Sequence, residues 1–262
     1  MFIATSFASA LPAEPWRWAV LLGLLGAIFG SFIAALVIRW PLERSVLGGR
    51  SVCDACGATL RAHELVPLLS ALWQRGRCRH CGAAIDPRHW RIEAAALLIG
   101  LSAGWVAPGV EGVGAAVFGW LLLALAALDL AEFWLPDELN LALALTGVAS
   151  AVLGLDPPLL DRLIGGAGGF ALLWAIGAGY KAARGRDGLG GGDPKLFGAI
   201  GLWLGWRLLP VVLLLAALIG LGIAGFRLMT GRAVRADDAL PLGTLLAIAA
   251  YPAELAMLSA SP

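Results

Sequence analysis

Long apolar segments limit what this chain can fold into more than any other feature does. A helix of roughly 17 to 25 apolar residues can cross a hydrocarbon core about 30 Å thick. Such segments recur at residues 16–38, 92–106, 112–128, 139–155, 163–180, 195–206, 208–226 and 240–258. The sixth segment is short and rich in glycine. The pattern predicts an all-α polytopic membrane protein with about eight transmembrane helices.

The composition agrees with a protein that lies in a lipid bilayer. The chain is 60% hydrophobic and only 14% charged, which is outside the range of soluble globular domains. Its formal net charge of +1 lacks the concentrated basic excess of a nucleic-acid-binding protein, so we expect no nucleic-acid partner. Residues 1–15 contain no basic region ahead of an apolar core, so the first helix is expected to be a retained anchor.

The distribution of lysine and arginine predicts the orientation. If the N-terminus lies outside, the loops at 39–91, 129–138, 181–195 and 227–238 face the cytoplasm. These loops contain 16 of the 19 basic residues, and the three others are Arg17, Arg162 and Arg207. A missed helix would scatter the basic loops to both sides, so the asymmetry supports the even number as well as the direction.

The polar insert at residues 39–91 is too long for a simple connection and should fold into a small unit. It contains all four cysteines as two CxxC pairs, Cys53 with Cys56 and Cys78 with Cys81, each followed by glycine. The 21 residues between the pairs are just beyond the usual spacing of a zinc ribbon. The pattern still predicts such a ribbon, in which four thiolates hold the metal in a closed, structural site. Two disulfides are the alternative, and a reducing cytoplasmic loop disfavours them. His80 and His89 are expected to be surface residues.

Acidic residues at the ends of apolar segments are the candidate catalytic groups. Asp129 closes the third segment, with Asp137 eight residues later, and Asp193 follows the glycine run 190–192. Two carboxylates brought close together share a proton and can activate a water molecule, as in an aspartic protease. No competing Ser/His/Asp arrangement is available, because every histidine lies in or beside the cysteine insert.

Asp193 also has a plain structural interpretation. It could be the N-cap of a helix that begins at Pro194, which its residue type and position would suit. Capping and catalysis do not exclude each other. The glycines before Asp193 would let an extended substrate strand approach the backbone. A phosphate-binding loop is not expected, because the GxxxxGK[ST] pattern is missing.

The combined motifs resemble the type IV prepilin peptidase family, also called leader peptidase/N-methyltransferase. The resemblance covers nearly the whole chain. It rests on "GSF" at 30–32 with "RWP" at 39–41, the paired CxxC motifs, "DLAEFWLPDELN" at 129–140, "GLGGGDPKLFGAIGLWLG" at 188–205 and "LPLGTLLAIAA" at 240–250.

The resemblance implies an intramembrane aspartic endopeptidase of the GxGD type in the bacterial inner membrane. It implies that Asp129 and Asp193 are the catalytic pair, with Asp129 preferred over Asp137. Gly190, Gly192 and Lys195 would support the site, and Lys195 would tune the pair or bind at the lipid interface. The expected substrates are prepilins or pseudopilins of pilus and type II secretion systems, cut on the cytoplasmic side.

Members of this family also methylate the new N-terminus from S-adenosylmethionine, and the cysteine loop accompanies that activity. The residues that bind the methyl donor are not identified by the sequence, although the 39–91 loop is the expected region. This chain departs from the family pattern at Ala34, Asp54 and Leu65. These departures bear on methylation more than on proteolysis.

The expected organisation is a first transmembrane helix at 1–38, a cytoplasmic zinc-binding loop domain at 39–91 and a transmembrane peptidase domain at 92–262. Two other classes of function remain. A transporter with an Asp129–Asp193 proton relay would show inverted repeats, and none is visible. A non-catalytic scaffold of the secretion machinery differs from the enzyme only in activity.

Overall fold

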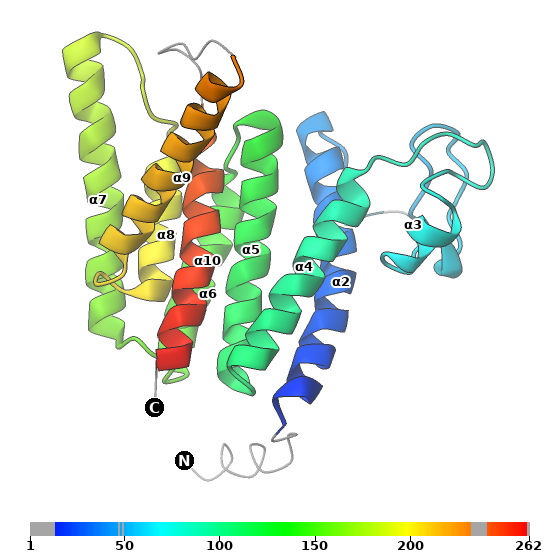
Figure 1. Cartoon of the computed structure of the whole chain (residues 1–262), viewed down its shortest axis with the longest axis horizontal. Helices are drawn as coiled ribbons and strands as arrows, with labels where there is room; N and C mark the ends of the chain where they lie inside the picture. Colours follow the sequence, from blue (N-terminus) through cyan, green and yellow to red (C-terminus); the bar gives the residue numbers. More distant parts are fainter. Residues whose placement is uncertain (1–13, 47, 49, 232–239, 261–262) are drawn as a thin grey trace. The chain divides into compact units, whose positions relative to one another are not determined.

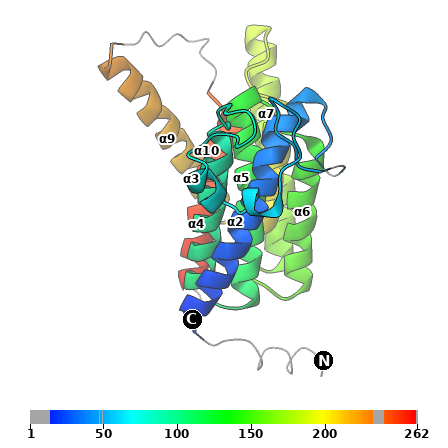
Figure 2. The same ribbon diagram turned by 90° about the vertical axis from the view of Figure 1, so that its right-hand side faces the viewer.

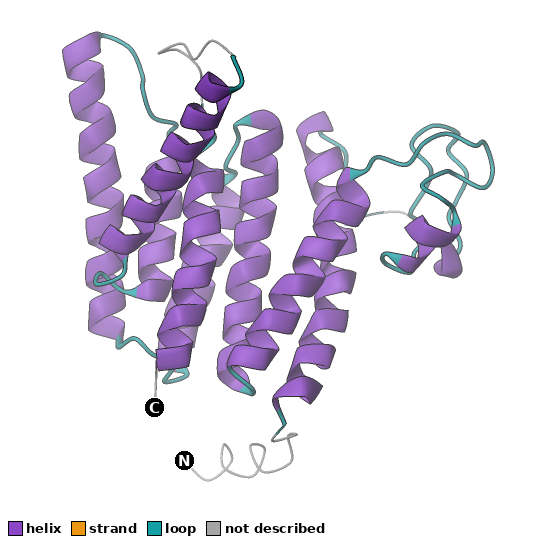
Figure 3. Ribbon diagram, in the orientation of Figure 1, coloured by secondary structure: helices purple, strands orange, loops and turns teal. Residues whose placement is uncertain are grey.

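A computed structural model describes residues 14–46, 48, 50–231 and 240–260. The described part is helical, with two isolated β-bridges in the cysteine insert and no longer strand (Figure 3). The chain divides into two compact units, residues 1–124 and 125–262. The start of the predicted first domain (1–13) and most of the predicted last loop (232–239) lie outside the described residues.

The first unit contains two long helices, α2 (Pro15–Arg39) and α4 (Arg88–Val106), with the cysteine insert between them in sequence. The insert holds η1 (Trp40–Leu42), η2 (Ala62–Glu64) and the short α3 (Leu69–Trp73). The helix α5 (Val110–Glu132) begins in this unit and ends in the second.

The second unit contains five further helices in chain order (Figure 1). They are α6 (Asp137–Val152), α7 (Leu159–Arg184), α8 (Asp193–Leu204), α9 (Leu209–Met229) and α10 (Leu242–Ala260). All eight predicted apolar segments are therefore helical.

Five of the eight helices, among the described residues, are long and apolar enough to cross a membrane. These spans are 15–42, 110–132, 159–184, 209–229 and 242–260. The helices α6, with 16 residues, and α8, with 12 residues, are too short for the same criterion. The first turn of α4 carries Arg88 and Arg91, which lowers its apolar character. By length and composition, the described residues thus contain five membrane spans where the sequence predicts eight.

Glycine allows α2 and α4 to lie side by side in the first unit (Figures 1 and 2). A Cβ atom at Gly100 of α4 would overlap the carbonyl oxygen of Leu22, and one at Gly26 of α2 would overlap the carbonyl oxygen of Ala96. Small residues four apart are the usual means by which helices approach closely in a membrane. The Trp120 indole N–H donates to the Ala96 carbonyl oxygen at 2.9 Å, which adds α5 to this pair.

The helix α8 is the buried centre of the second unit, since ten of its 12 residues are buried. It packs against α7 through glycines on both helices, and a Cβ atom at Gly201 would overlap the carbonyl oxygen of Gly165. Its indole at Trp203 donates to the Leu143 carbonyl oxygen of α6 at 2.8 Å. These contacts fix the position of Asp193 at the first turn of α8.

Arg162, near the start of α7, is 1% exposed and ties three parts of the second unit together. Its guanidinium donates to the carbonyl oxygens of Gly147 in α6, of Leu202 in α8 and of three residues in the loop 155–157, and also to the hydroxyl of Ser150. A buried cation is tolerated only when its donors are satisfied in this way.

Replacing Gly100 by valine should separate α2 from α4, because the new side chain overlaps the Leu22 backbone, which cannot move independently. We expect a loss of about 1 to 3 kcal/mol or more of unfolding free energy, measured by denaturant unfolding in detergent. Gly222→Val in α9 is the control, since a Cβ atom there meets nothing within 4 Å. Equal stability of the two variants would contradict the proposed close packing.

Candidate active site and metal centre

Asp129 lies near the end of α5 and is only 4% exposed. Its Oδ2 atom accepts hydrogen bonds from the backbone N–H of Thr244 at 2.7 Å and from the Thr244 hydroxyl at 3.0 Å. Thr244 is the third residue of α10, so its N–H is one of the donors that a helix leaves unpaired at its start. The N-terminus of α10 therefore binds and orients the carboxylate.

The residue before Thr244 must be small. A Cβ atom at Gly243 would lie 3.1 Å from the Asp129 Oδ2 atom and 2.9 Å from the Leu135 methyl groups. The contact between the 240–250 segment and Asp129 was not predicted from the sequence, in which that segment contributes only to the resemblance. A Gly-Thr pair at the start of an apolar helix was the available signal.

Asp193 is the first residue of α8 and is 7% exposed. Its Oδ2 atom accepts the Gly190 backbone N–H at 3.0 Å, and its own N–H donates to the Gly190 carbonyl oxygen at 3.2 Å. The N-cap residue is Gly192, and it provides no side-chain cap. The alternative in which Asp193 caps a helix beginning at Pro194 is therefore wrong, because the carboxylate binds the loop behind it.

The two aspartates share surroundings within the second unit. Leu135 packs beside both sites, since a Cβ atom at Gly192 would lie 2.6 Å from its Cβ. Among the described residues, neither Oδ1 atom has a hydrogen-bond partner. Each buried carboxylate thus has one oxygen held and one oxygen available.

Lys195 binds Asp137, not either of the two buried aspartates. Its ammonium lies 2.6 Å and 2.8 Å from the two carboxylate oxygens of Asp137. The Asp137 side chain is 70% exposed. An exposed carboxylate already paired with a lysine is less suited to hold a proton than a buried one, which favours Asp129 over Asp137.

The cysteine insert is built from two matching turns. In the first, Cys53 N–H donates to the Ala58 carbonyl oxygen, and Gly57 N–H donates to the Cys53 carbonyl oxygen. The second repeats this pattern at Cys78, Ala83 and Gly82. Gly57 and Gly82 have φ angles of +70° and +72°, which residues with a Cβ atom rarely adopt.

The four thiols lie within 4.8 Å of one another, and Cys53 and Cys81 are 4.0 Å apart. Tetrahedral Zn–S bonds of about 2.3 Å place the sulfurs about 3.8 Å apart, so the cluster fits zinc. All four cysteines are free, which excludes the disulfide alternative in this structure. Backbone N–H groups of Cys56 and Ala55 lower the pKa of the Cys53 thiol to about 7, whereas burial and the neighbouring thiols raise the pKa of Cys81 to about 11. A bound cation would therefore be needed to hold all four cysteines as thiolates.

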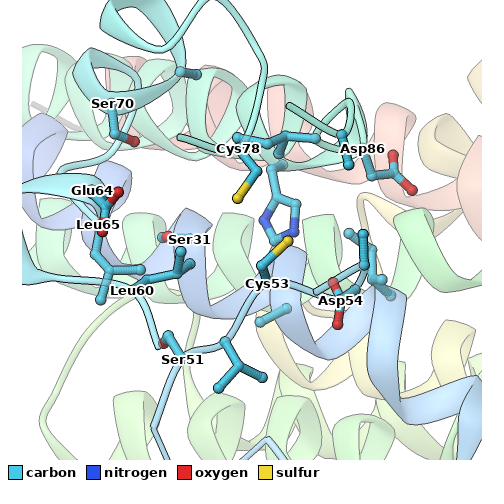
Figure 4. Close-up of a pocket in the computed structure, with 18 of the residues that line it drawn as sticks. Ser31, Ser51, Cys53, Asp54, Leu60, Glu64, Leu65, Ser70, Cys78 and Asp86 are labelled. Carbon is cyan, nitrogen blue, oxygen red and sulfur yellow. The ribbon is translucent and has the colours of Figure 1, made fainter. Parts of the chain in front are cut away.

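The two histidines of the insert have different environments. The His80 imidazole is exposed, as expected, and its Nε2 atom lies 3.8 Å from the buried Glu64 carboxylate. His89, expected on the surface, is instead half-buried and lines a cavity of about 500 Å³. Cys53 and Cys78 line the same cavity (Figure 4). The expectation for His89 was wrong because the insert folds back over the end of α2 and the start of α4.

Comparison with known families matches residues 24–107 to the bacterial peptidase A24 N-terminal domain and residues 116–225 to the type IV leader peptidase family. A prepilin leader peptidase/N-methyltransferase of Aeromonas salmonicida (strain A449) is 37% identical, over 92% of this chain and 91% of that protein. The chain belongs to the type IV leader peptidase family. Its many apolar helices are those of a multi-pass membrane protein.

Further members of the type IV leader peptidase family show similar agreement. Proteins of the same name from Burkholderia pseudomallei (strain K96243) and Pseudomonas putida are 38% and 34% identical, over 86% and 94% of this chain and 81% and 93% of their own lengths. No solved structure matches the chain. Both aspartates lie within the range matched to the peptidase family.

The metal site can be tested on the purified chain. We expect about one zinc ion per chain, and Cys78→Ser should release most of it because a closed tetrahedral site needs all four thiolates. His80→Ala is the matched control, since His80 contacts Glu64 and is not needed as a ligand. Elemental analysis would contradict the cluster if Cys78→Ser kept its zinc or the wild type contained none.

Proposed function

We propose that this protein cuts the leader peptide from type IV prepilins or pseudopilins at the cytoplasmic membrane face. Asp129 and Asp193 would activate the attacking water. The proposal is supported by family membership and by the names of the relatives. The observation that carries it is the pair of buried carboxylates, each with one oxygen held by backbone N–H groups and one available.

Two buried carboxylates that interact cannot both be charged at low cost, so the pair holds one proton. The ionised member takes a proton from the water, and the resulting hydroxide adds to the carbonyl carbon of the scissile bond. The protonated member gives its proton to the carbonyl oxygen. The C–N bond then breaks as the leaving nitrogen takes up a proton, which yields one carboxylic acid and one amine.

The surrounding residues would hold this geometry. Thr244 would hold Asp129 in place, and the Gly190 N–H would hold Asp193. In both residues the hydrogen bonds reach the Oδ2 atom, which limits rotation of the carboxylate. Gly192 lets the Leu135 side chain lie close, and Gly190 leaves room for the Asp193 carboxylate, because a Cβ atom there would lie 3.0 Å from its Oδ2 atom. The Lys195–Asp137 pair would anchor the start of α6 to the start of α8 beside the site.

The proposed protein crosses the bacterial inner membrane eight times, with the N-terminus outside. The three shorter or more polar helices, α4, α6 and α8, would complete the crossings, and their close packing against longer helices supports this. Residues 1–38 would form the first transmembrane helix, 39–91 the cytoplasmic zinc-binding domain and 92–262 the peptidase domain. The basic loops on one side support this orientation.

The second proposed activity is N-methylation of the new N-terminus, as in the names of the relatives. S-adenosylmethionine would supply a methyl group from its positively charged sulfur, which keeps the electrons of the broken C–S bond while the amine nitrogen forms the new bond and loses a proton. Zinc would stabilise the insert and not react, because its four thiolates leave no open position.

The peptidase proposal predicts that Asp129→Asn and Asp193→Asn each abolish leader cleavage. Neither amide can take a proton from water, and losses of about 10²-fold to 10⁴-fold are expected for a general acid–base group. The measurement is the rate of prepilin trimming by the purified chain in detergent. Asp137→Asn is the matched control and should keep most of the activity, because Asp137 is exposed and bound to Lys195. Normal cleavage by either buried-site variant would overturn the pair.

The methylation proposal predicts that the processed pilin gains about 14 Da per methyl group when S-adenosylmethionine is added. Mass spectrometry of the pilin N-terminus measures this gain directly. Asp193→Asn is an informative control with pre-cleaved pilin as substrate, because methylation by the first unit should survive loss of the peptidase. An unchanged mass with the wild-type chain would exclude methylation.

A further inference from the structure

The cavity in the first unit contains a buried carboxylate without a cationic partner. It has a volume of about 500 Å³, which is in the range of small-molecule sites. Four acidic residues line it: Asp54, Glu64, Asp86 and Glu93. They differ in how their charge is compensated, and that difference identifies the residue that a ligand would meet.

Three of the four acids already have a basic group nearby. Asp86 accepts two hydrogen bonds from the Arg88 guanidinium, at 2.7 and 2.9 Å. Asp54 lies 3.9 Å from Arg44 and 4.0 Å from Arg39. Glu64 lies 3.8 Å from His80 and accepts the Arg61 backbone N–H.

Glu93 is the exception. It is 6% exposed, and its Oε2 atom accepts the Leu68 backbone N–H at 2.8 Å. Among the described residues, its Oε1 atom has no hydrogen-bond partner and no lysine or arginine forms an ion pair with it. His89 lines the same cavity, and burial lowers the pKa of its imidazole, which disfavours a compensating positive charge there.

A buried carboxylate without a cation is costly, and a positively charged ligand would remove that cost. The cysteine cluster adds to the negative potential, because Cys53 and Cys78 both line the cavity (Figure 4). The unpaired acid in the lining therefore favours a ligand with a positive group, and Arg39 and Arg44 in the same lining favour a negative group elsewhere on that ligand.

The remaining lining suits the rest of an adenosyl amino acid. Apolar side chains from α2 and the insert form a surface for a flat heterocycle, at Ala35, Ile38, Leu60, Leu65 and Ile85. Arg44 lies at the rim with a 61% exposed side chain and only a long contact to Asp54, so it can bind an amino-acid carboxylate. One ligand would thus use the acid, the apolar wall and the arginine together.

We propose that this cavity binds S-adenosylmethionine, with Glu93 neutralising its positive charge and the apolar wall holding its adenine. This assignment rests on the proposed methyltransferase activity and names the residues for it. The hydrogen bond from Leu68 has a clear role in this site. Leu68 has a φ angle of +61°, and Glu93 holds that strained backbone so that the 65–74 segment forms one wall.

The test is calorimetric binding to the full chain in detergent with zinc present. S-adenosylmethionine is compared with 5′-methylthioadenosine, a neutral probe that keeps only the adenosyl part. Glu93→Gln should weaken binding of the cationic probe by at least about tenfold, as expected for loss of one charged partner. It should change binding of the neutral probe by much less, because glutamine still accepts the Leu68 N–H.

Two further variants make the result specific. Asp86→Asn changes the formal charge of the same wall equally, but its carboxylate is held by Arg88, so a smaller loss is expected. Ala71→Trp should fill the cavity and weaken the binding of both probes. If Glu93→Gln loses its zinc, the binding measured with Ala71→Trp tests whether the ligand occupies this cavity. All variants should cleave prepilin at the wild-type rate, since the proposed peptidase pair lies in the other unit.

The outcomes separate this inference from the proposed function. Equal binding of S-adenosylmethionine by the wild type, Glu93→Gln and Ala71→Trp would place the methyl donor elsewhere while leaving methylation intact. No binding by the wild type would overturn both the site and methylation, and the cleavage assay would still test the peptidase independently.

Discussion

A charged group taken into an apolar helix bundle must find its hydrogen-bond partners within the protein, and this requirement shapes the second unit. Asp129 and Asp193 accept hydrogen bonds from the backbone N–H groups of Thr244 and Gly190. Arg162 donates hydrogen bonds to carbonyl oxygens of α6, α8 and the 155–157 loop. Because the partners are main-chain groups, the positions of the charges depend on helix ends and loop geometry more than on neighbouring side chains. Glycine is then needed wherever the backbone comes close, as at Gly192 and Gly243.

Much of this arrangement was predictable from local patterns. All eight apolar segments form helices. A long apolar segment can satisfy its backbone hydrogen bonds away from water by forming a helix, which a loop cannot do. The four cysteines converge because each CxxC turn is fixed by its own glycine, and the two turns repeat the same hydrogen bonds. The residues Asp129 and Asp193 stand out as acids at the ends of apolar helices, and the resemblance to the family predicts that they act as a pair.

The remaining contacts depend on tertiary structure that no local pattern contains. Thr244 meets Asp129 across 115 positions in the chain, and Lys195 meets Asp137 across 58. Neither pairing has a spacing rule such as the one that relates neighbours on one helix. The capping interpretation of Asp193 fitted its residue type. In the structure, however, its carboxylate points back toward Gly190 and accepts the Gly190 backbone N–H. No local pattern marks Glu93, because its place in the wall of a cavity depends on how the insert folds.

The difference between paired and unpaired acids explains where chemistry can occur. Asp137 has Lys195 and Asp86 has Arg88, so both can stay ionised without further help. In the second unit, the described residues give Asp129 and Asp193 hydrogen-bond donors but no cation. Protonation of one member would therefore be the least unfavourable way to reduce the buried negative charge. Glu93 in the first unit has the same deficit, but a cavity beside it, so a cationic ligand can supply what a proton supplies in the second. The same cost of burying an unpaired carboxylate would thus be met by a shared proton at the proposed peptidase site and by a cationic ligand at the proposed methyl-donor site.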